Sequence, residues 1–203
     1  MDVIGLTGQP NAYADASLET HEDLIARARR GDEEAFRLIF ERYTRPVISF
    51  IFYMVNRRDV AEELAQETFV RAYKSLGALR DEAKLSTWLF GIAKNVARES
   101  IRSGHQEMRD IGIEERAARE MSDDTALPDD QLLDKELSRV MRRALNALDE
   151  DKRLVFTLKV YQQLSYEEIA EVTGFSLPKI RNDLHRARGE MRRRLSHYLE
   201  GRS

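Results

Sequence analysis

The chain has 203 residues, of which 42% are hydrophobic and 34% are charged, a balance typical of a soluble helical protein. It contains no cysteine, which excludes disulfides and thiolate metal sites, and its four histidines lack the spacing of a zinc site. No apolar run approaches the roughly 18 residues of a membrane span, and no signal peptide is recognisable. We therefore expect a cytoplasmic protein that is not inserted in a membrane.

The net charge of −3 conceals a segregation along the chain. Residues 1–103 contain 15 basic and 16 acidic residues, residues 104–134 contain 3 and 10, and residues 135–203 contain 15 and 10. Such asymmetry predicts two folded parts joined by an acidic segment. The expected division, in chain order, is a flexible tail at 1–20, a helical domain at 21–103, an acidic flexible linker at 104–130 and a second helical domain at 131–200.

The first helical domain contains a series of helix signals. Asp32 is a suitable N-cap, and Pro46 is expected to bend or interrupt the helix that follows. Asp59 and Glu62 have the spacing of a capping box at the start of the segment VAEELAQETFVRAYKSL. The apolar side chains expected to face inward from this segment are Val60, Leu64, Phe69 and Tyr73.

The opposite face of the same segment is polar and mostly acidic. Its outward residues are Glu62, Glu63, Gln66, Glu67 and Arg71. Spacing alone favours the simpler interpretation, a solvated helix face, over a docking surface for a partner.

A later helix, STWLFGIAKNVARESIR, has a basic edge that includes Lys94 and Arg98. Ser86 or Thr87 can cap it. The single tryptophan of the chain, Trp88, lies at its start. From composition alone, a lone tryptophan in a helical domain is more often a core residue than a platform for a nucleic-acid base.

The segment LSYEEIAEVTGFSLPKIRNDLHRARGEMRRR predicts a helix-turn-helix. Ser165 and Glu168 have capping-box spacing, Gly174 suits the left-handed turn that ends the first helix, and Ser176 is an N-cap for the second. Residues 174–194 contain seven Lys or Arg and two acids. This arrangement favours DNA binding in the major groove over a merely solvated basic helix. With the two helices expected before it, the motif makes a four-helix unit.

Three segments resemble the extracytoplasmic-function (ECF) group of bacterial sigma factors. LSYEEIAEVTGFSLPKIRNDLHRAR resembles their fourth conserved region. DVAEELAQETFVRAYKSL resembles the segment that docks on the clamp coiled coil of the largest RNA polymerase subunit, and TWLFGIAKN resembles the TWLxxIAxN signature that binds the minus-10 element. The likeness covers residues 21–103 and 131–198. It implies an all-α fold of two small helical domains, the C-terminal one a helix-turn-helix unit.

The resemblance assigns residues to three contacts. Docking on core polymerase falls on Glu63, Gln66, Glu67 and Arg71. Binding of the minus-10 element, with capture of an unstacked base, falls on Leu79, Trp88, Lys94, Asn95 and Arg98. Recognition of the minus-35 element falls on Lys159, Lys179, Arg181, Asn182, His185 and Arg186. Arginine and asparagine suit bidentate contacts to bases.

Two positions depart from the family pattern. Leu79 stands where the family often has an aromatic residue, so the resemblance does not imply base stacking by this loop. Asp183 stands where the family frequently has a basic residue. Its carboxylate either weakens binding to a phosphate or accepts a hydrogen bond from a cytosine amino group, and both alternatives stay open.

The resemblance implies a sigma factor that directs initiation at promoters by recognising minus-10 and minus-35 elements, in a stress-response role. Its partners would be promoter DNA, core polymerase (through the clamp coiled coil and the flap) and an anti-sigma factor. It implies no catalytic site, no cofactor and no metal. The acidic linker is either a spacer or a mimic of nucleic acid that enters polymerase channels. The alternative function is a stand-alone helix-turn-helix transcriptional regulator, which would bind DNA without polymerase.

Overall fold

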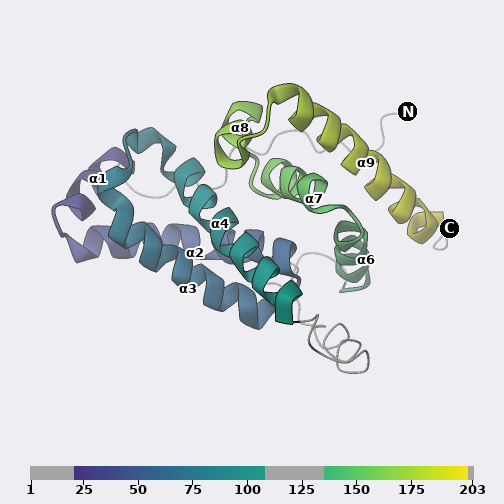
Figure 1. Ribbon diagram of the computed structural model, residues 1–203, viewed down its shortest axis with the longest axis horizontal. Coiled ribbons are helices and arrows are strands. Elements are labelled where there is room, and N and C mark those ends of the chain that lie inside the picture. The colour runs from purple at the N-terminus through teal and green to yellow at the C-terminus, as the bar shows by residue number, and fades with distance from the viewer. Residues whose placement is uncertain (1–20, 108–134, 201–203) are drawn as a thin grey trace.

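The computed structural model describes residues 21–107 and 135–200. Every regular element in those ranges is a helix. Figure 1 shows two bodies side by side, one coloured purple to teal and the other green to yellow. The all-α architecture of two helical units is therefore confirmed. The tail at 1–20 and residues 108–134 of the acidic segment lie outside the described residues.

The N-terminal unit has four α-helices and two short 3-10 turns. They are α1 (His21–Arg29), α2 (Glu33–Val55), α3 (Arg58–Ser75), η1 (Leu76–Ala78), η2 (Glu82–Lys84) and α4 (Leu85–Glu107). Asp32 caps α2 as expected, because its side chain accepts a hydrogen bond from the Ala35 amide at 3.2 Å. Of the two expected effects of Pro46, a bend or an interruption, the interruption is wrong. Pro46 is buried inside one continuous α2, where packing in the core outweighs its poor helix propensity.

The expected capping box at the start of α3 is also wrong. The helix already begins at Arg58, and the preceding Arg57 makes no capping hydrogen bond through its side chain. Both acidic side chains form ion pairs with arginines instead. Asp59 pairs with Arg57 at 2.5 Å, and Glu62 pairs with Arg58 at 2.9 Å.

The bounds of α4 differ from the expected ones at both ends. The helix begins at Leu85, directly after η2, so Ser86 and Thr87 lie inside it and do not cap it. It ends at Glu107, so residues 104–107 of the expected linker are helical.

The C-terminal unit contains α6 (Lys135–Asn146), α7 (Glu150–Phe156), the π-helical turn η4 (Thr157–Tyr161), α8 (Tyr166–Thr173) and α9 (Leu177–Glu200). Its helix-turn-helix signals are confirmed. Ser165 accepts a hydrogen bond from the Glu168 amide at 3.1 Å, and the Glu168 carboxylate accepts one from the Ser165 amide at 2.7 Å. Gly174 ends α8 with a φ of 74°, and Ser176 accepts a hydrogen bond from the Lys179 amide at 3.4 Å.

The two units pack against each other, and their buried apolar residues form one hydrophobic cluster. α4 lies against α8, and α2 lies against α6, α7 and η4. At the α2 end of the contact, the ring of Tyr53 stacks on that of Tyr161 with centroids 4.2 Å apart. Beside them the largely buried guanidinium of Arg153 donates to the Met54 carbonyl at 3.2 Å, and burial lowers the pKa of Arg153. We call this packing the closed arrangement.

Candidate functional surfaces

The exposed face of α3 carries the residues assigned to polymerase docking. Glu63, Gln66 and Glu67 all point to solvent. Arg71 is different, because it binds Glu67 on its own helix and Glu99 on α4, each at 2.8 Å. The hydrogen bond from Arg71 lowers the pKa of Glu99. Arg71 therefore ties α3 to α4 and orients Glu67, while the other three side chains form the open face.

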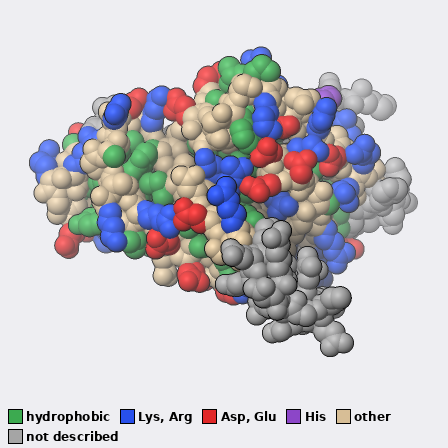
Figure 2. Space-filling view, in the orientation of Figure 1, with side chains coloured by type: hydrophobic (Ala, Val, Ile, Leu, Met, Phe, Trp, Pro, Cys, Tyr) green, Lys and Arg blue, Asp and Glu red, His purple; other side chains and the backbone are tan. Residues whose placement is uncertain are grey.

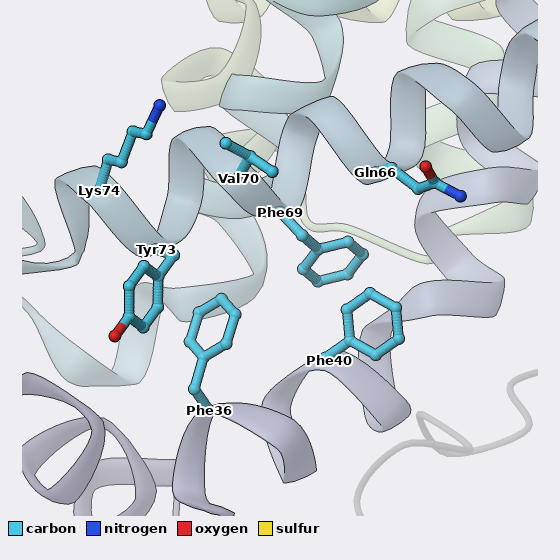
Figure 3. Close-up of a pocket in the computed structure, with 7 residues that line it drawn as sticks. All are labelled: Phe36, Phe40, Gln66, Phe69, Val70, Tyr73 and Lys74. Carbon is cyan, nitrogen blue, oxygen red and sulfur yellow. The ribbon is translucent and has the colours of Figure 1, made fainter. Parts of the chain in front are cut away.

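An apolar groove of about 350 Å³ continues this face along α3 and α2 (Figure 3). Its lining residues are Phe36, Phe40, Gln66, Phe69, Val70, Tyr73 and Lys74. Tyr73 is 51% exposed and meets Phe36 edge-on at 4.9 Å, so the expectation that it faces inward is wrong. Val70 is 46% exposed and Phe40 38%. We call this feature the α2–α3 groove.

Sequence reasoning missed the apolar part of this surface, although a signal for it was present. Val70 and Tyr73 follow Gln66 by four and seven residues, the spacing that places side chains on one face of a helix. An outward polar residue followed at these intervals by large apolar residues indicates a mixed polar and apolar surface. The contribution of Phe40 from α2 depends on tertiary packing and has no such local signal.

Four of the five residues assigned to the minus-10 element, all except Arg98, line a hollow of about 590 Å³ at the start of α4. Trp88 is half-buried there, beside Lys94 and the exposed Asn95. Leu79 is only 4% exposed and belongs to the core, while the neighbouring Arg80 is exposed at the rim. The far wall of the hollow belongs to α8 and is formed by Glu171 and Val172.

The basic edge of α4 is covered by the C-terminal unit. The ammonium of Lys94 donates to the Val172 carbonyl at 2.7 Å, and burial at this contact lowers the pKa of Lys94. The guanidinium of Arg98 donates to Glu150 at 2.6 Å and to Asp151 at 3.2 Å, at the first turn of α7. Two of the residues assigned to DNA are thus already engaged within the molecule.

Further contacts extend this seam between the units. Lys84 of η2 pairs with Glu171 of α8 at 2.6 Å, and the pairing raises the pKa of Lys84. Because both side chains are nearly half exposed, solvent screens the pair, and it stabilises the contact only weakly by itself. The Thr87 hydroxyl donates to the Glu168 carboxylate at 3.4 Å. Figure 2 shows basic and acidic side chains intermixed in the middle of the view, where the two units meet.

The residues assigned to the minus-35 element form two groups. Arg181, Asn182, His185 and Arg186 are exposed on α9. Within residues 21–107 and 135–200, no ion pair involves any of these four side chains. This part of α9 is open to a partner.

The two assigned lysines are turned toward the protein instead. Lys159 donates to the Leu164 carbonyl at 2.9 Å. Lys179 binds Asp183 at 2.5 Å and Asp151 at 3.0 Å, and these two carboxylates raise its pKa. Asp183 is 8% exposed, and the two alternatives raised for its effect on DNA binding stay predictions. Its carboxylate accepts a hydrogen bond from the ammonium of Lys179.

The described part of the chain contains neither a candidate metal-binding group nor a membrane-spanning helix. No group of three or more histidine or acidic side chains there could hold a metal ion. No helix there has the length and apolar character needed to cross a membrane.

Comparisons with known proteins match both helical units. The model of Sigma-70 region 2 matches residues 39–106, and that of Sigma-70 region 4 matches residues 138–191. The ECF RNA polymerase sigma-E factor of Haemophilus influenzae is 32% identical over 181 residues, which cover 83% of this chain and 92% of that protein. The RNA polymerase sigma-H factor of Pseudomonas aeruginosa is 31% identical over 175 residues, which cover 84% of this chain and 91% of that protein.

Solved structures show a similar fold. The sigma factor RpoE in complex with the anti-sigma factor NepR, from Bartonella quintana, has a TM-score of 0.68 at 22% identity. The match covers 79% of this chain and 96% of that one. CnrH in complex with the cytosolic domain of CnrY has a TM-score of 0.60 at 26% identity, covering 89% of this chain and 97% of that one.

A basic helix-turn-helix unit indicates a DNA-binding protein, and the matches to Sigma-70 regions 2 and 4 place it among the factors of transcription initiation. The chain belongs to the ECF group of sigma-70 factors. It is a sigma factor that binds core RNA polymerase and recognises promoters, and the alternative of a stand-alone regulator is not favoured. Sigma factors as a class are not enzymes.

Proposed function

We propose that three surfaces of this sigma factor divide its work in the cytoplasm. The exposed face of α3 and the α2–α3 groove dock on core polymerase, the hollow at the start of α4 takes the minus-10 element, and the exposed face of α9 reads the minus-35 element. The observation that carries the proposal is that the three surfaces present side chains of different chemical character. An acidic and apolar face suits a protein partner, whereas the edge of α4 and the exposed face of α9 carry the basic side chains that suit DNA.

Docking on polymerase would use the two parts of the α3 surface differently. Glu63, Gln66 and Glu67 would pair with basic and polar groups of the coiled coil, which favours specificity and fast association. Val70 and Tyr73 would supply apolar area, and tyrosine is among the residues that most often dominate binding energy. Apolar residues next to charged ones match the usual centre and rim of a protein interface.

Binding of the minus-10 element would centre on Trp88. Extracting a base from the stack costs a few kcal/mol, and stacking on an aromatic ring returns about 1–3 kcal/mol per base. Asn95 is exposed and has the donors and acceptor to read a base edge, while Lys94 and Arg98 would hold phosphates. Since Leu79 is in the core, we propose that Arg80 provides the contact from this loop.

Recognition of the minus-35 element would fall on Arg181, Asn182, His185 and Arg186, whose side chains are open to solvent. Lys179 would need to leave Asp151 before it could hold a phosphate. Lys159 would support the fold of the unit through the Leu164 carbonyl rather than touch DNA.

We also propose an anti-sigma factor as a partner of this chain, and the flap of polymerase as a contact of its C-terminal unit. RpoE of Bartonella quintana is in complex with the anti-sigma factor NepR. In this chain the apolar α2–α3 groove is a surface that such a partner could cover.

The first test is transcription in vitro with core polymerase, on DNA from upstream of this gene. We expect a discrete transcript only when the protein is present, because core enzyme alone does not select promoters. The start site would locate the two promoter elements. A lack of transcript, together with a lack of co-elution with core, would contradict the proposal.

The docking surface is tested by Glu63→Lys with Glu67→Lys and, separately, by Tyr73→Ser. The double change reverses the charge of the polar part, and the single change removes the largest exposed apolar side chain. Both should abolish or strongly reduce co-elution with core polymerase. Glu167→Lys, on the exposed face of α8, is the control for added positive charge and should co-elute normally. Normal co-elution of both docking variants would show that polymerase binds elsewhere.

A further inference from the structure

The ring of Tyr166 contacts two cations of the C-terminal unit. The ammonium of Lys159, from η4, lies over the ring at 5.1 Å from its centroid. The guanidinium carbon of Arg181, from α9, lies over the ring at 5.9 Å. Both distances are within the roughly 6 Å at which the electron-rich face of an aromatic ring attracts a cation. Three elements of the helix-turn-helix unit, η4, α8 and α9, therefore meet at one side chain.

The protein holds this ring in place. Tyr166 is the first residue of α8 and directly follows Ser165, whose capping box with Glu168 fixes the start of the helix. The ring is half-buried and packs against the hydrophobic cluster. Lys159 is also anchored, because its ammonium donates to the Leu164 carbonyl at 2.9 Å. The ring is thus a fixed platform for the more mobile side chain of Arg181.

Arg181 is exposed near the start of α9, where a recognition helix reads bases. In the part of the chain that the structure describes, no ion pair holds its guanidinium. A free arginine side chain has many rotamers, and the freedom that it loses on binding opposes the contact. Contact with a ring reduces this loss. It engages the flat face of the guanidinium and leaves the N–H groups at its edge for bidentate donation to guanine.

We propose that Tyr166 is a positioning residue for Arg181 and determines how strictly the protein reads the minus-35 base pair that Arg181 contacts. Tyr166 acts through the guanidinium and does not itself touch a base. Lys159 supplies the second cationic contact of the same ring and does not bind DNA. This inference rests on the assignment of Arg181 to the minus-35 element in the proposed function.

The test uses the holoenzyme and a set of duplexes in which each base pair of the minus-35 element is changed in turn. Arg181→Ala identifies the base pair that Arg181 reads, because discrimination is lost there alone. Tyr166→Leu should lower discrimination at that base pair by about two- to ten-fold, the cost of fixing one mobile side chain, and leave the other positions unchanged. Added to Arg181→Ala, it should cause no further loss there.

Two more variants separate the ring from other features. Tyr166→Phe keeps the ring without the hydroxyl and should discriminate as wild type does. An equal loss in the Phe and Leu variants would mean that the hydroxyl contacts DNA, which would refute the positioning role.

Phe175→Leu is the matched control, because it also removes a ring that lies beside a cation in the same unit. The ammonium of Lys179 lies over the Phe175 ring at 4.4 Å from its centroid. This cation is already held by Asp151 and Asp183, so base discrimination should not change. If Phe175→Leu lowers discrimination as much as Tyr166→Leu, general loosening of the unit explains both, and the proposal is wrong.

The outcomes distinguish this inference from the proposed function. If the wild-type protein gives no transcript, or if Arg181→Ala discriminates at every base pair as wild type does, the proposed assignment fails and this inference fails with it. If Arg181→Ala loses discrimination at one base pair and Tyr166→Leu does not, only the role of Tyr166 is overturned. A lower thermal midpoint of Tyr166→Leu with an equal loss of binding to all duplexes would show a purely structural role, and would also overturn it.

Discussion

α4 and α9 are both basic helices assigned to promoter DNA, but their surroundings differ. The assigned residues of α9 that are exposed, among them Asn182 and Arg186, face solvent. On α4, in contrast, the assigned Lys94 and Arg98 face the other unit, where they are bound by α8 and α7. The difference shows that a basic edge predicts what a helix can bind but not whether that edge is available.

Packing accounts for the difference. α9 uses one apolar stripe, with Ile180 and Leu184 fully buried, against its own unit, which leaves its opposite side free. α4 is held on two sides. Leu89 and Ala93 point into the N-terminal unit, while its basic edge lies along α8.

The largest effect is expected from removing two proposed base contacts on the open helix. Asn182→Ala with Arg186→Ala should weaken promoter binding by the holoenzyme at least roughly 30-fold, since each bidentate contact is worth about 1–3 kcal/mol. The measurement is competition binding on a duplex that contains the minus-35 element. Co-elution with core polymerase should not change, because α3 is untouched.

Arg193→Ala is the matched control for this variant. It removes the same charge from an exposed position on α9, seven residues after Arg186 and about 10 Å further along the helix axis. Residues near the start of a recognition helix read the bases, so we expect a small loss for Arg193→Ala. A loss as large as that of Arg186→Ala alone would mean that α9 supplies charge without reading sequence.

An intermediate effect is expected at the covered helix. Trp88→Ala should weaken binding of the holoenzyme to a single-stranded minus-10 probe by about 5- to 150-fold, the loss of one stacked base. Trp88→Phe keeps a ring and should recover most of the affinity. Binding to the minus-35 duplex should be unchanged in both.

The alternative for Trp88 is a purely structural role. Its side chain is half-buried and packs against the core, so Trp88→Ala also removes apolar contacts. A core residue would lower the thermal midpoint of Trp88→Ala without a selective loss of single-stranded binding. That result would mean that Trp88 of α4 supports the fold and does not bind a base.

Features that depend on neighbours in sequence could be predicted without a structure. The Asp32 cap, the capping box at Ser165 and the Gly174 turn all arise from hydrogen bonds or dihedrals within four residues. The capping box and the Gly174 turn sufficed to predict the helix-turn-helix, whereas the all-α fold of two domains came from the family resemblance. Local competition explains one failure, because Asp59 and Glu62 pair with arginines before they can cap α3.

Contacts between distant residues could not be predicted in this way. Lys94 and Val172 are 78 positions apart, and no periodicity in either helix specifies their meeting. The inward turn of Asp183 likewise depends on Lys179 and on α7 beneath it. The assignments of site residues to polymerase and DNA came from resemblance and remain predictions, whereas their availability followed only from the packing of the two units.

The smallest effect concerns α8, which covers α4 on one side and leads into α9 on the other. Ser165→Ala removes the hydrogen bond that the Glu168 amide donates to the Ser165 hydroxyl, a loss of about 1 kcal/mol that should lower the thermal midpoint by about 2–4 °C. Ser86→Ala is the control, because Ser86 lies inside α4 and caps nothing, so its midpoint should stay within about 1 °C of wild type. If α8 holds the closed arrangement, Ser165→Ala should also strengthen single-stranded DNA binding slightly, even as the protein becomes less stable. A parallel fall of stability and DNA binding would instead mean that α8 supports α4 rather than obstructing it.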